Sequence, residues 1–338
     1  MNITVILCTY NRCHRLAKAL DSVAASALPE SVAWEVLVVD NNSSDQTREV
    51  VEDFGRRYPG RFRYLFEPVQ GKSHALNAGI RAARGEILAF IDDDVTVEPT
   101  WLQNLTAPLG DNEWAGTGGR ILPEHAFSPP NWLALDGPYS MVSILYAHFD
   151  LGDKPCELEC APYGTNMAFQ KRMFEKHGGF RTDLGPSLNG EVPRPGEDTE
   201  FGRRLMAARE HLRYEPSAVV YHEVPENRIK KEYFLRWWFD YGRARAREAG
   251  RGRDVWGIPR HILSIPKLVG ITVAIRTLQG LWTLNPQRRF FRKCMVWMAA
   301  GWIVEMPRVA RNVKRQKDNA RDKDSSQGPK IMQGSVMF

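Results

Sequence analysis

The front part of the chain alternates between short apolar runs and helical patterns, and this alternation constrains the fold more than any other feature. Apolar runs rich in β-branched residues occupy residues 3–8, 34–39, 62–66 and 87–91. Amphipathic patterns fill the intervals at residues 12–26, 45–57 and 72–84. Such alternation predicts an α/β fold, with a mostly parallel sheet covered by helices on both faces. Its ligand sites are expected at the carboxyl ends of the strands.

Polar clusters follow three of these runs directly, at residues 9–11, 40–45 and 92–94. In a parallel sheet the three clusters lie along one edge. Turn and N-cap chemistry accounts for residues 43–45. Three adjacent carboxylates at the end of a buried strand repel one another unless a cation is present, and oxygen ligands favour Mg²⁺ or Mn²⁺. A solvated turn at residues 92–94 is the alternative interpretation.

Two later features carry further candidate side chains. Glu197 and Asp198 begin a helical pattern after a Gly/Pro-rich loop, where acidic residues either complement the helix dipole or act as a general base. His222 ends the apolar run 219–222. It is either a structural histidine or an additional metal ligand, and the second role requires it to lie near Asp94 in space.

Taken in order, these pieces resemble the family 2 glycosyltransferases, which have the GT-A fold and use nucleotide sugars. The resemblance spans about residues 3–222. The matching segments are VILCTYNR at 5–12, VVDNNSSD at 38–45, GKSHALNAG at 71–79, FIDDD at 90–94 and GED at 196–198.

The resemblance implies a role for individual residues. Asp198 is the expected base with Glu197 beside it, and Asp94 and His222 are the expected ligands of Mn²⁺ or Mg²⁺. Asp40 is expected to accept a hydrogen bond from the nucleobase. Lys72 and Asn77 are expected to contact the donor, and a structural role at a helix start is the alternative for these two residues. The full set of expected donor contacts is Thr9, Tyr10, Arg12, Asp40, Asn42, Lys72, Asn77, Asp92, Asp93, Gly164 and Asn166.

The reaction implied by the resemblance is an inverting transfer from a nucleotide-diphosphate sugar, with UDP as the expected carrier. The acceptor would be a hydroxyl of a saccharide or a lipid-linked saccharide in cell-envelope or exopolysaccharide synthesis. A catalytically silent saccharide- or lipid-binding relative is the alternative. A nucleotidyltransferase or a dinucleotide-dependent oxidoreductase is disfavoured, because no Gly-rich loop follows the first apolar run.

The C-terminal third has a different character. The chain carries 46 Lys and Arg against 40 Asp and Glu, and its basic residues crowd into residues 228–321. Residues 232–243 are aromatic and basic together, and apolar helical patterns at 262–284 and 291–304 are broken by charges. The uncharged apolar runs in these regions, at residues 268–275 and 295–304, are shorter than the roughly 18 residues that a membrane-spanning helix needs. The segment predicts helices that attach to a membrane surface, and a helical subdomain packed on the core is the alternative. No motif supports nucleic-acid binding.

These observations predict three parts of the chain. Residues 1–225 form the catalytic domain, with a nucleotide-sugar half at 1–98 and an acceptor half at 99–225. Residues 226–311 form the helical, membrane-associating segment, and the polar composition of 312–338 predicts a disordered tail. Five cysteines without paired spacing, and an N-terminus without signal-peptide features, predict a reduced cytoplasmic protein on the inner face of the cell membrane. A metal or a small closed loop at Cys156 and Cys160 is a further alternative.

Overall fold

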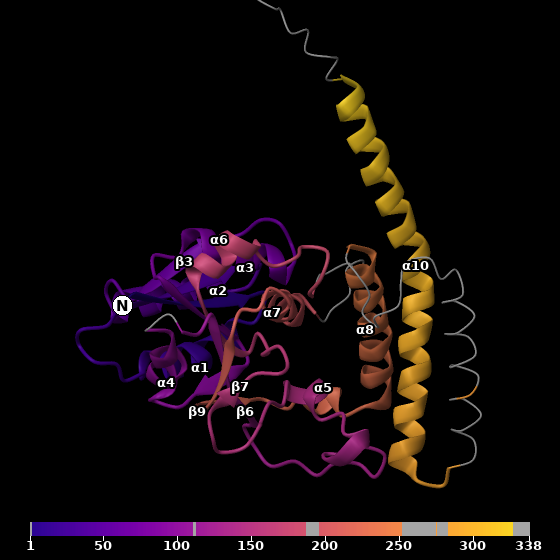
Figure 1. Ribbon diagram of the computed structural model, residues 1–338. Coiled ribbons are helices and arrows are strands. Elements are labelled where there is room, and N and C mark those ends of the chain that lie inside the picture. Colours follow the sequence, from indigo (N-terminus) through magenta and orange to yellow (C-terminus); the bar gives the residue numbers. More distant parts are fainter. Residues whose placement is uncertain (1, 111–112, 187–195, 252–274, 276–282, 327–338) are drawn as a thin grey trace, which may run out of the picture.

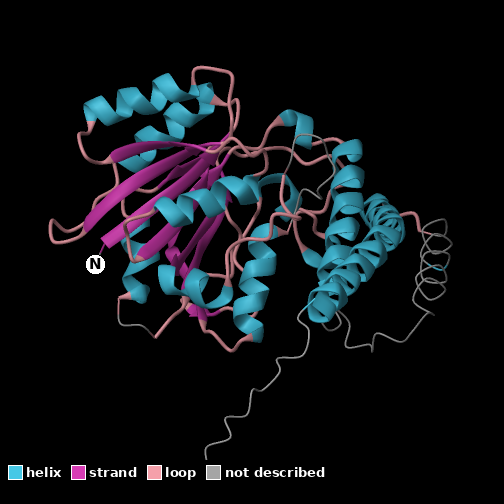
Figure 2. Cartoon of the chain, turned by 90° about the horizontal axis from the view of Figure 1, so that it is seen from above, coloured by secondary structure: helices cyan, strands magenta, loops and turns pink. Residues whose placement is uncertain are grey.

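The computed structural model describes residues 2–110, 113–186, 196–251, 275 and 283–326. An α/β body carries the N-terminus, and a pair of long helices stands against the opposite end of this body (Figures 1 and 2). The segment at 187–195 and most of the pattern at 262–284 lie outside the described residues.

The α/β body is built on one mixed sheet. In the described residues its order is β3-β2-β1-β4-β8-β6-β9-β5, and the short β7 pairs with β9. The first four strands of this order are parallel, and β8 joins β4 in the antiparallel sense. The strand bounds are β1 (Asn2–Thr9), β2 (Ala33–Asp40), β3 (Phe62–Phe66), β4 (Ile87–Asp92), β5 (Val95–Val97), β6 (Gly116–Pro123), β7 (Cys156–Glu157), β8 (Asn166–Gln170) and β9 (Leu212–His222). The predicted fold class is confirmed.

Helices cover both faces of this sheet (Figure 2). Leu16 and Leu20 of α1 and Phe54 of α2 are buried, because apolar residues recur on one face of each helix. The α-helices of the body are α1 (Cys13–Ala24), α2 (Thr47–Arg57), α3 (Lys72–Ala82), α4 (Trp101–Thr106), α5 (Ser143–Tyr146), α6 (Lys171–His177) and α7 (Glu197–Ala207). Short 3₁₀ turns lie at η1 (Ala107–Leu109), η2 (Gly137–Tyr139) and η3 (Glu226–Arg228).

Strand register brings the polar clusters together. Thr9 at the end of β1 lies opposite Asp40 at the end of β2, and Cys8 lies opposite Asp92 on β4. The expectation that these clusters share one edge of the sheet is therefore confirmed.

The helix pair consists of α8 (Lys231–Arg251) and α10 (Pro286–Ser326), which lie side by side (Figures 1 and 2). Glu305 of α10 is almost fully buried and accepts hydrogen bonds from Arg243 at 3.0 Å and from Arg247 at 2.7 Å. Helix α10 continues through residues 312–326, where composition predicted disorder, so that expectation is corrected for these residues. Residues 327–338 are outside the described range. None of the described helices combines the length and the apolar character that crossing a bilayer requires.

Candidate active site

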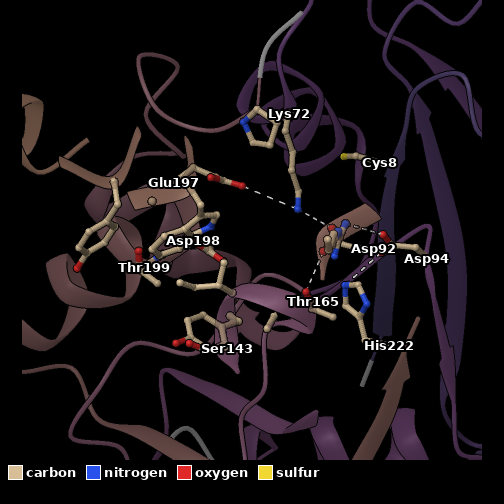
Figure 3. Close-up of a pocket in the computed structure, with 18 of the residues that line it drawn as sticks. Cys8, Lys72, Asp92, Asp94, Ser143, Thr165, Glu197, Asp198, Thr199 and His222 are labelled. Atoms are coloured by element: carbon tan, nitrogen blue, oxygen red, sulfur yellow. Dashed lines mark hydrogen bonds and ion pairs between the residues drawn. The ribbon is translucent and has the colours of Figure 1, made fainter. Parts of the chain in front are cut away.

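A cavity of about 720 Å³ opens where the strands β1 and β4 end, between the start of α7 and the helix pair. This volume suits a small-molecule ligand. Figure 3 shows carboxylates, Lys72 and His222 around it. The predicted site residues that line it are Thr9, Tyr10, Arg12, Lys72, Asp92, Asp93, Asp94, Glu197, Asp198 and His222.

The three consecutive carboxylates have different partners. Asp92 binds the ammonium of Lys72 and accepts a hydrogen bond from the Thr165 hydroxyl at 2.8 Å. Burial alone would raise the pKa of Asp92, but Lys72 outweighs burial and lowers this pKa to about 2. Asp93 accepts from the Thr9 hydroxyl at 2.7 Å and from Arg12 at 2.8 Å. Burial, together with the neighbouring charge of Asp94, nevertheless raises the pKa of Asp93.

Asp94 and His222 face each other across the edge of the sheet. Strand β5 pairs with β9 so that Val95 lies opposite His222, and this register brings the His222 Nε2 to 3.5 Å from the Asp94 Oδ1 (Figure 3). The His222 Nδ1 lies 2.6 Å from the backbone oxygen of Glu223. A carbonyl only accepts, so Nδ1 donates this hydrogen bond, and Nε2 is the ring nitrogen that faces the carboxylate.

This geometry fits a shared cation. A ring nitrogen and a carboxylate oxygen that face each other can share a cation, and of the two expected ions Mn²⁺ accepts a nitrogen ligand more readily than Mg²⁺, which prefers oxygen ligands. The described residues contain no group of three or more His, Cys, Asp or Glu that could hold an ion. The remaining ligands would therefore have to come from substrate oxygens and water. Arg12 and Arg228 each lie 3.3 Å from the Asp94 Oδ2 and offset its charge.

Glu197 and Asp198 stand on the opposite side of the cavity, at the start of α7 (Figure 3). Gly196 precedes them with a φ of +117°, which favours glycine. The two oxygens of Asp198 accept the backbone N–H groups of Gly164 at 2.7 Å and of Thr199 at 2.6 Å. Each oxygen keeps a lone pair, so a substrate hydroxyl can still donate to it.

Glu197 has a different environment from Asp198. Its side chain is buried, and burial with the neighbouring charge of Asp198 raises the pKa of Glu197 to about 8, although Lys72 opposes the shift. Two adjacent carboxyl groups therefore have distinct characters, one largely protonated near neutral pH and one held by backbone donors.

Asn77 and Asn166 are predicted donor contacts that have structural roles instead. The side-chain oxygen of Asn77 accepts a hydrogen bond from the backbone N–H of Phe180 at 2.8 Å, and its side-chain N–H donates to the backbone oxygen of Phe180 at 2.7 Å. Asn166 is fully buried and connects the indole of Trp101 with two backbone carbonyls of the sheet. Neither residue lines the cavity, so the expected donor contacts of these two asparagines are corrected.

Asp40, Asn42 and Gly164 also lie outside the cavity lining. The carboxylate of Asp40 is buried and accepts from the Tyr64 hydroxyl at 2.8 Å and from the backbone of Ser43 at 2.9 Å. Asn42 is exposed on the loop after β2. Gly164 acts through its backbone bond to Asp198, and a side chain there would meet this carboxylate at 3.2 Å.

Sequence reasoning missed several cavity residues. Thr165 lies between Gly164 and Asn166, which the resemblance singled out, but Arg228 follows β9 in a 3₁₀ turn that carries no recognisable motif. The aromatic residues of the helix pair were assigned to a membrane surface, yet Trp237, Trp238 and Phe291 line the cavity. All five cysteines are free, and Cys160 lies at the cavity.

Comparison with known proteins agrees with this geometry. The chain is 28% identical over 263 residues to the succinoglycan biosynthesis protein ExoM of Rhizobium meliloti (strain 1021), covering 76% of this chain and 80% of the relative. It is 27% identical over 248 residues to a glucosyl-dolichyl phosphate glucuronosyltransferase of Haloferax volcanii, covering 72% of this chain and 76% of the relative.

Solved structures share the fold. The mannosyltransferase PcManGT from Pyrobaculum calidifontis, in complex with GDP-Man and Mn²⁺, superposes with a TM-score of 0.61 at 19% identity, covering 89% of this chain and 86% of that one. The sequence profile described as Glycosyl transferase family 2 matches residues 4–178. The chain therefore belongs to glycosyl transferase family 2 and is a glycosyltransferase of the GT-A fold.

Proposed function

We propose that this enzyme moves a sugar from a nucleotide-diphosphate sugar, with UDP as the expected carrier, to a hydroxyl of a saccharide or lipid-linked acceptor in cell-envelope or exopolysaccharide synthesis. The observation that carries the proposal is the shared cavity. Asp94 and His222 face each other on one side of it, and Asp198 stands on the other. ExoM is named for succinoglycan biosynthesis, and the Haloferax relative acts on a glucosyl-dolichyl phosphate, so both names agree with such an acceptor.

The chemistry follows from the roles of these side chains. Asp198 accepts the proton of the acceptor hydroxyl while that oxygen bonds to the anomeric carbon of the donor. The bond between this carbon and the diphosphate oxygen breaks, and the nucleoside diphosphate leaves. Attack from the side opposite the leaving group inverts the anomeric carbon, an assignment that rests on the resemblance alone.

Positively charged side chains line the side of the cavity that we assign to the diphosphate. Negative charge builds up on the diphosphate as it leaves, and these side chains would stabilise it. Arg12 and Arg228 converge on Asp94, and Lys72 lies at Asp92. A bound Mn²⁺ or Mg²⁺, held by Asp94 and His222, would supply Lewis-acid stabilisation of the diphosphate. The PcManGT complex contains Mn²⁺, which makes this ion the first to test.

The test is release of nucleoside diphosphate from UDP-, GDP- and dTDP-sugars with Mn²⁺ or with EDTA. Metal-dependent release from one donor, lost in Asp94→Ala and in Asp198→Asn, is the expected result. Nucleotide binding without release from any donor would favour the silent binding relative instead.

Attachment to a membrane surface is a separate proposal. Its support is a set of exposed apolar side chains on α10, Trp297, Ile303 and Val304, which the exposed Arg308 and Arg311 follow. Co-sedimentation with anionic vesicles at low salt, reduced when Trp297, Ile303 and Val304 are changed to Ser, is the expected outcome. Equal recovery in the supernatant with and without vesicles would contradict attachment.

A further inference from the structure

One wall of the cavity is aromatic. Tyr233, Trp237, Trp238 and Tyr241 of α8 line it together with Phe291 of α10. These side chains come from the C-terminal helix pair, whereas the residues assigned above to the metal and the leaving group come mainly from the ends of strands. The residues matched by the family profile therefore lack this part of the cavity.

Trp237 and Tyr241 form a stacked pair of rings in this wall. They are four residues apart on α8, so they lie on the same helix face, and their rings stack with centroids 5.2 Å apart and planes 12° apart. Trp238 packs its ring edge-to-face against both, with centroids at 5.4 and 5.6 Å. These contacts fix the ring orientations before any ligand arrives, which lowers the entropic cost of binding.

The aromatic wall and Asp198 line the same cavity. Residues of α8 reach the turn before this carboxylate, because a side chain at Gly196 would meet Glu248 at 3.5 Å and Ala244 at 3.7 Å. Tyr163 lines the cavity next to Gly164, whose N–H bonds Asp198. Tyr163 is also close enough to Asp198 and Tyr241 for their charges to add to the effect of burial in raising its pKa to about 12.

We propose that Trp237 and Tyr241 bind a sugar ring of the acceptor, and that they hold one of its hydroxyls towards Asp198. A pyranose face presents C–H groups that pack on a flat aromatic surface, while its hydroxyls project from the rim and stay free to react. This inference rests on the proposed transferase function and adds that the enzyme recognises a saccharide at this subsite.

The test measures nucleoside-diphosphate release with the preferred donor and Mn²⁺, against increasing concentrations of methyl glycosides of glucose, galactose, mannose and N-acetylglucosamine. In Trp237→Ala the KM for the glycoside that stimulates release should rise roughly tenfold more than the KM for the donor. Trp237→Phe should recover part of the loss. Trp34→Ala is the matched control, since it removes a partly exposed indole of β2 that does not line the cavity.

The outcomes separate this inference from the function on which it rests. If the wild type releases no nucleoside diphosphate from any donor, the transferase proposal fails and the subsite fails with it. If a glycoside stimulates release and Trp237→Ala leaves its KM unchanged, the transferase stands and the aromatic subsite is wrong. Stimulation by a polyprenyl phosphate, and by no glycoside, would assign the wall to a lipid chain and overturn the saccharide assignment.

Discussion

The ammonium of Lys72 lies 3.8 Å from the Oε1 of Glu197 and also binds the carboxylate of Asp92. This single cation connects the end of β4, on the proposed donor side, with the start of α7, on the proposed acceptor side (Figure 3). Burial alone would lower the pKa of Lys72, but the two carboxylates raise it well above its usual range. Lys72 therefore stays charged and holds the two sides of the cavity together.

Replacing Lys72 by Met should destabilise the fold, because the ionised, partly buried Asp92 loses its counter-charge. We expect a loss of about 3 kcal/mol in the free energy of unfolding, as for other broken buried ion pairs. Urea unfolding near neutral pH measures it. Lys154→Met, at an exposed position, is the control, and equal unfolding midpoints in both variants would contradict the role of Lys72.

Glu197 should make stability depend on pH. Its pKa rises from 4.5 to about 8 on folding, so between these values the folded chain keeps a proton that the unfolded chain has released. The free energy of unfolding therefore falls as pH increases through this window. Relative to Glu197→Gln, which cannot ionise, the wild type should lose on the order of 4 kcal/mol between about pH 5 and about pH 8.5.

Urea unfolding of both proteins at several pH values measures this difference. Asp92 contributes with the opposite sign, but its depressed pKa of about 2 confines that effect to pH values below its ordinary 3.8. A difference between wild type and Glu197→Gln that stays constant with pH would show that Glu197 is not the group responsible.

The sequence allowed the donor edge of the site to be predicted, because parallel strands end at one edge and their following residues are then neighbours in space. Thr9 and Asp92 are such cases, whereas Lys72 was expected from the family resemblance alone. The proximity of Asp94 and His222 could be stated only as a requirement for a metal site. It depends on the register between β5 and β9, and no local sequence pattern fixes the pairing of two strands so far apart in the chain.

Other residues were given a different role from the one that the structure indicates, because the same side chain can serve either in a ligand site or in packing. Asn166 follows Thr165, which lines the cavity, but side chains alternate between the two faces along a strand. The Asn166 side chain therefore points into the core, where it makes three hydrogen bonds. Trp237 and Phe291 have the composition of a membrane surface, and only tertiary packing shows that they face the cavity. The helical continuation through residues 312–326 was missed because polar composition alone favours disorder.

Loss of the His222 imidazole should weaken metal binding without unfolding the site. In His222→Ala the affinity for Mn²⁺ in the presence of UDP should drop roughly 10- to 100-fold, because one of two protein ligands is missing. Calorimetric titration of Mn²⁺ measures it. His125→Ala is the control, since His125 is an exposed histidine outside the cavity, and equal Mn²⁺ affinity in the two variants would remove His222 from the metal shell.

The crossing of α8 and α10 should tolerate no added side chain at Gly242. A Cβ atom there would lie 1.9 Å from the backbone oxygen of Met298, and Gly301 makes the reciprocal approach to Phe239 at 2.0 Å. Gly242→Val must therefore push the helices apart, at a cost of about 1 to 3 kcal/mol.

Since Phe291 on α10 and Trp237 on α8 both line the cavity, the same change should raise the acceptor KM more than the donor KM. Thermal unfolding and initial-rate kinetics measure the two effects, with Arg289→Ala, an exposed change on α10, as the control. A Gly242→Val protein with wild-type stability and kinetics would show that the close helix crossing does not support the cavity.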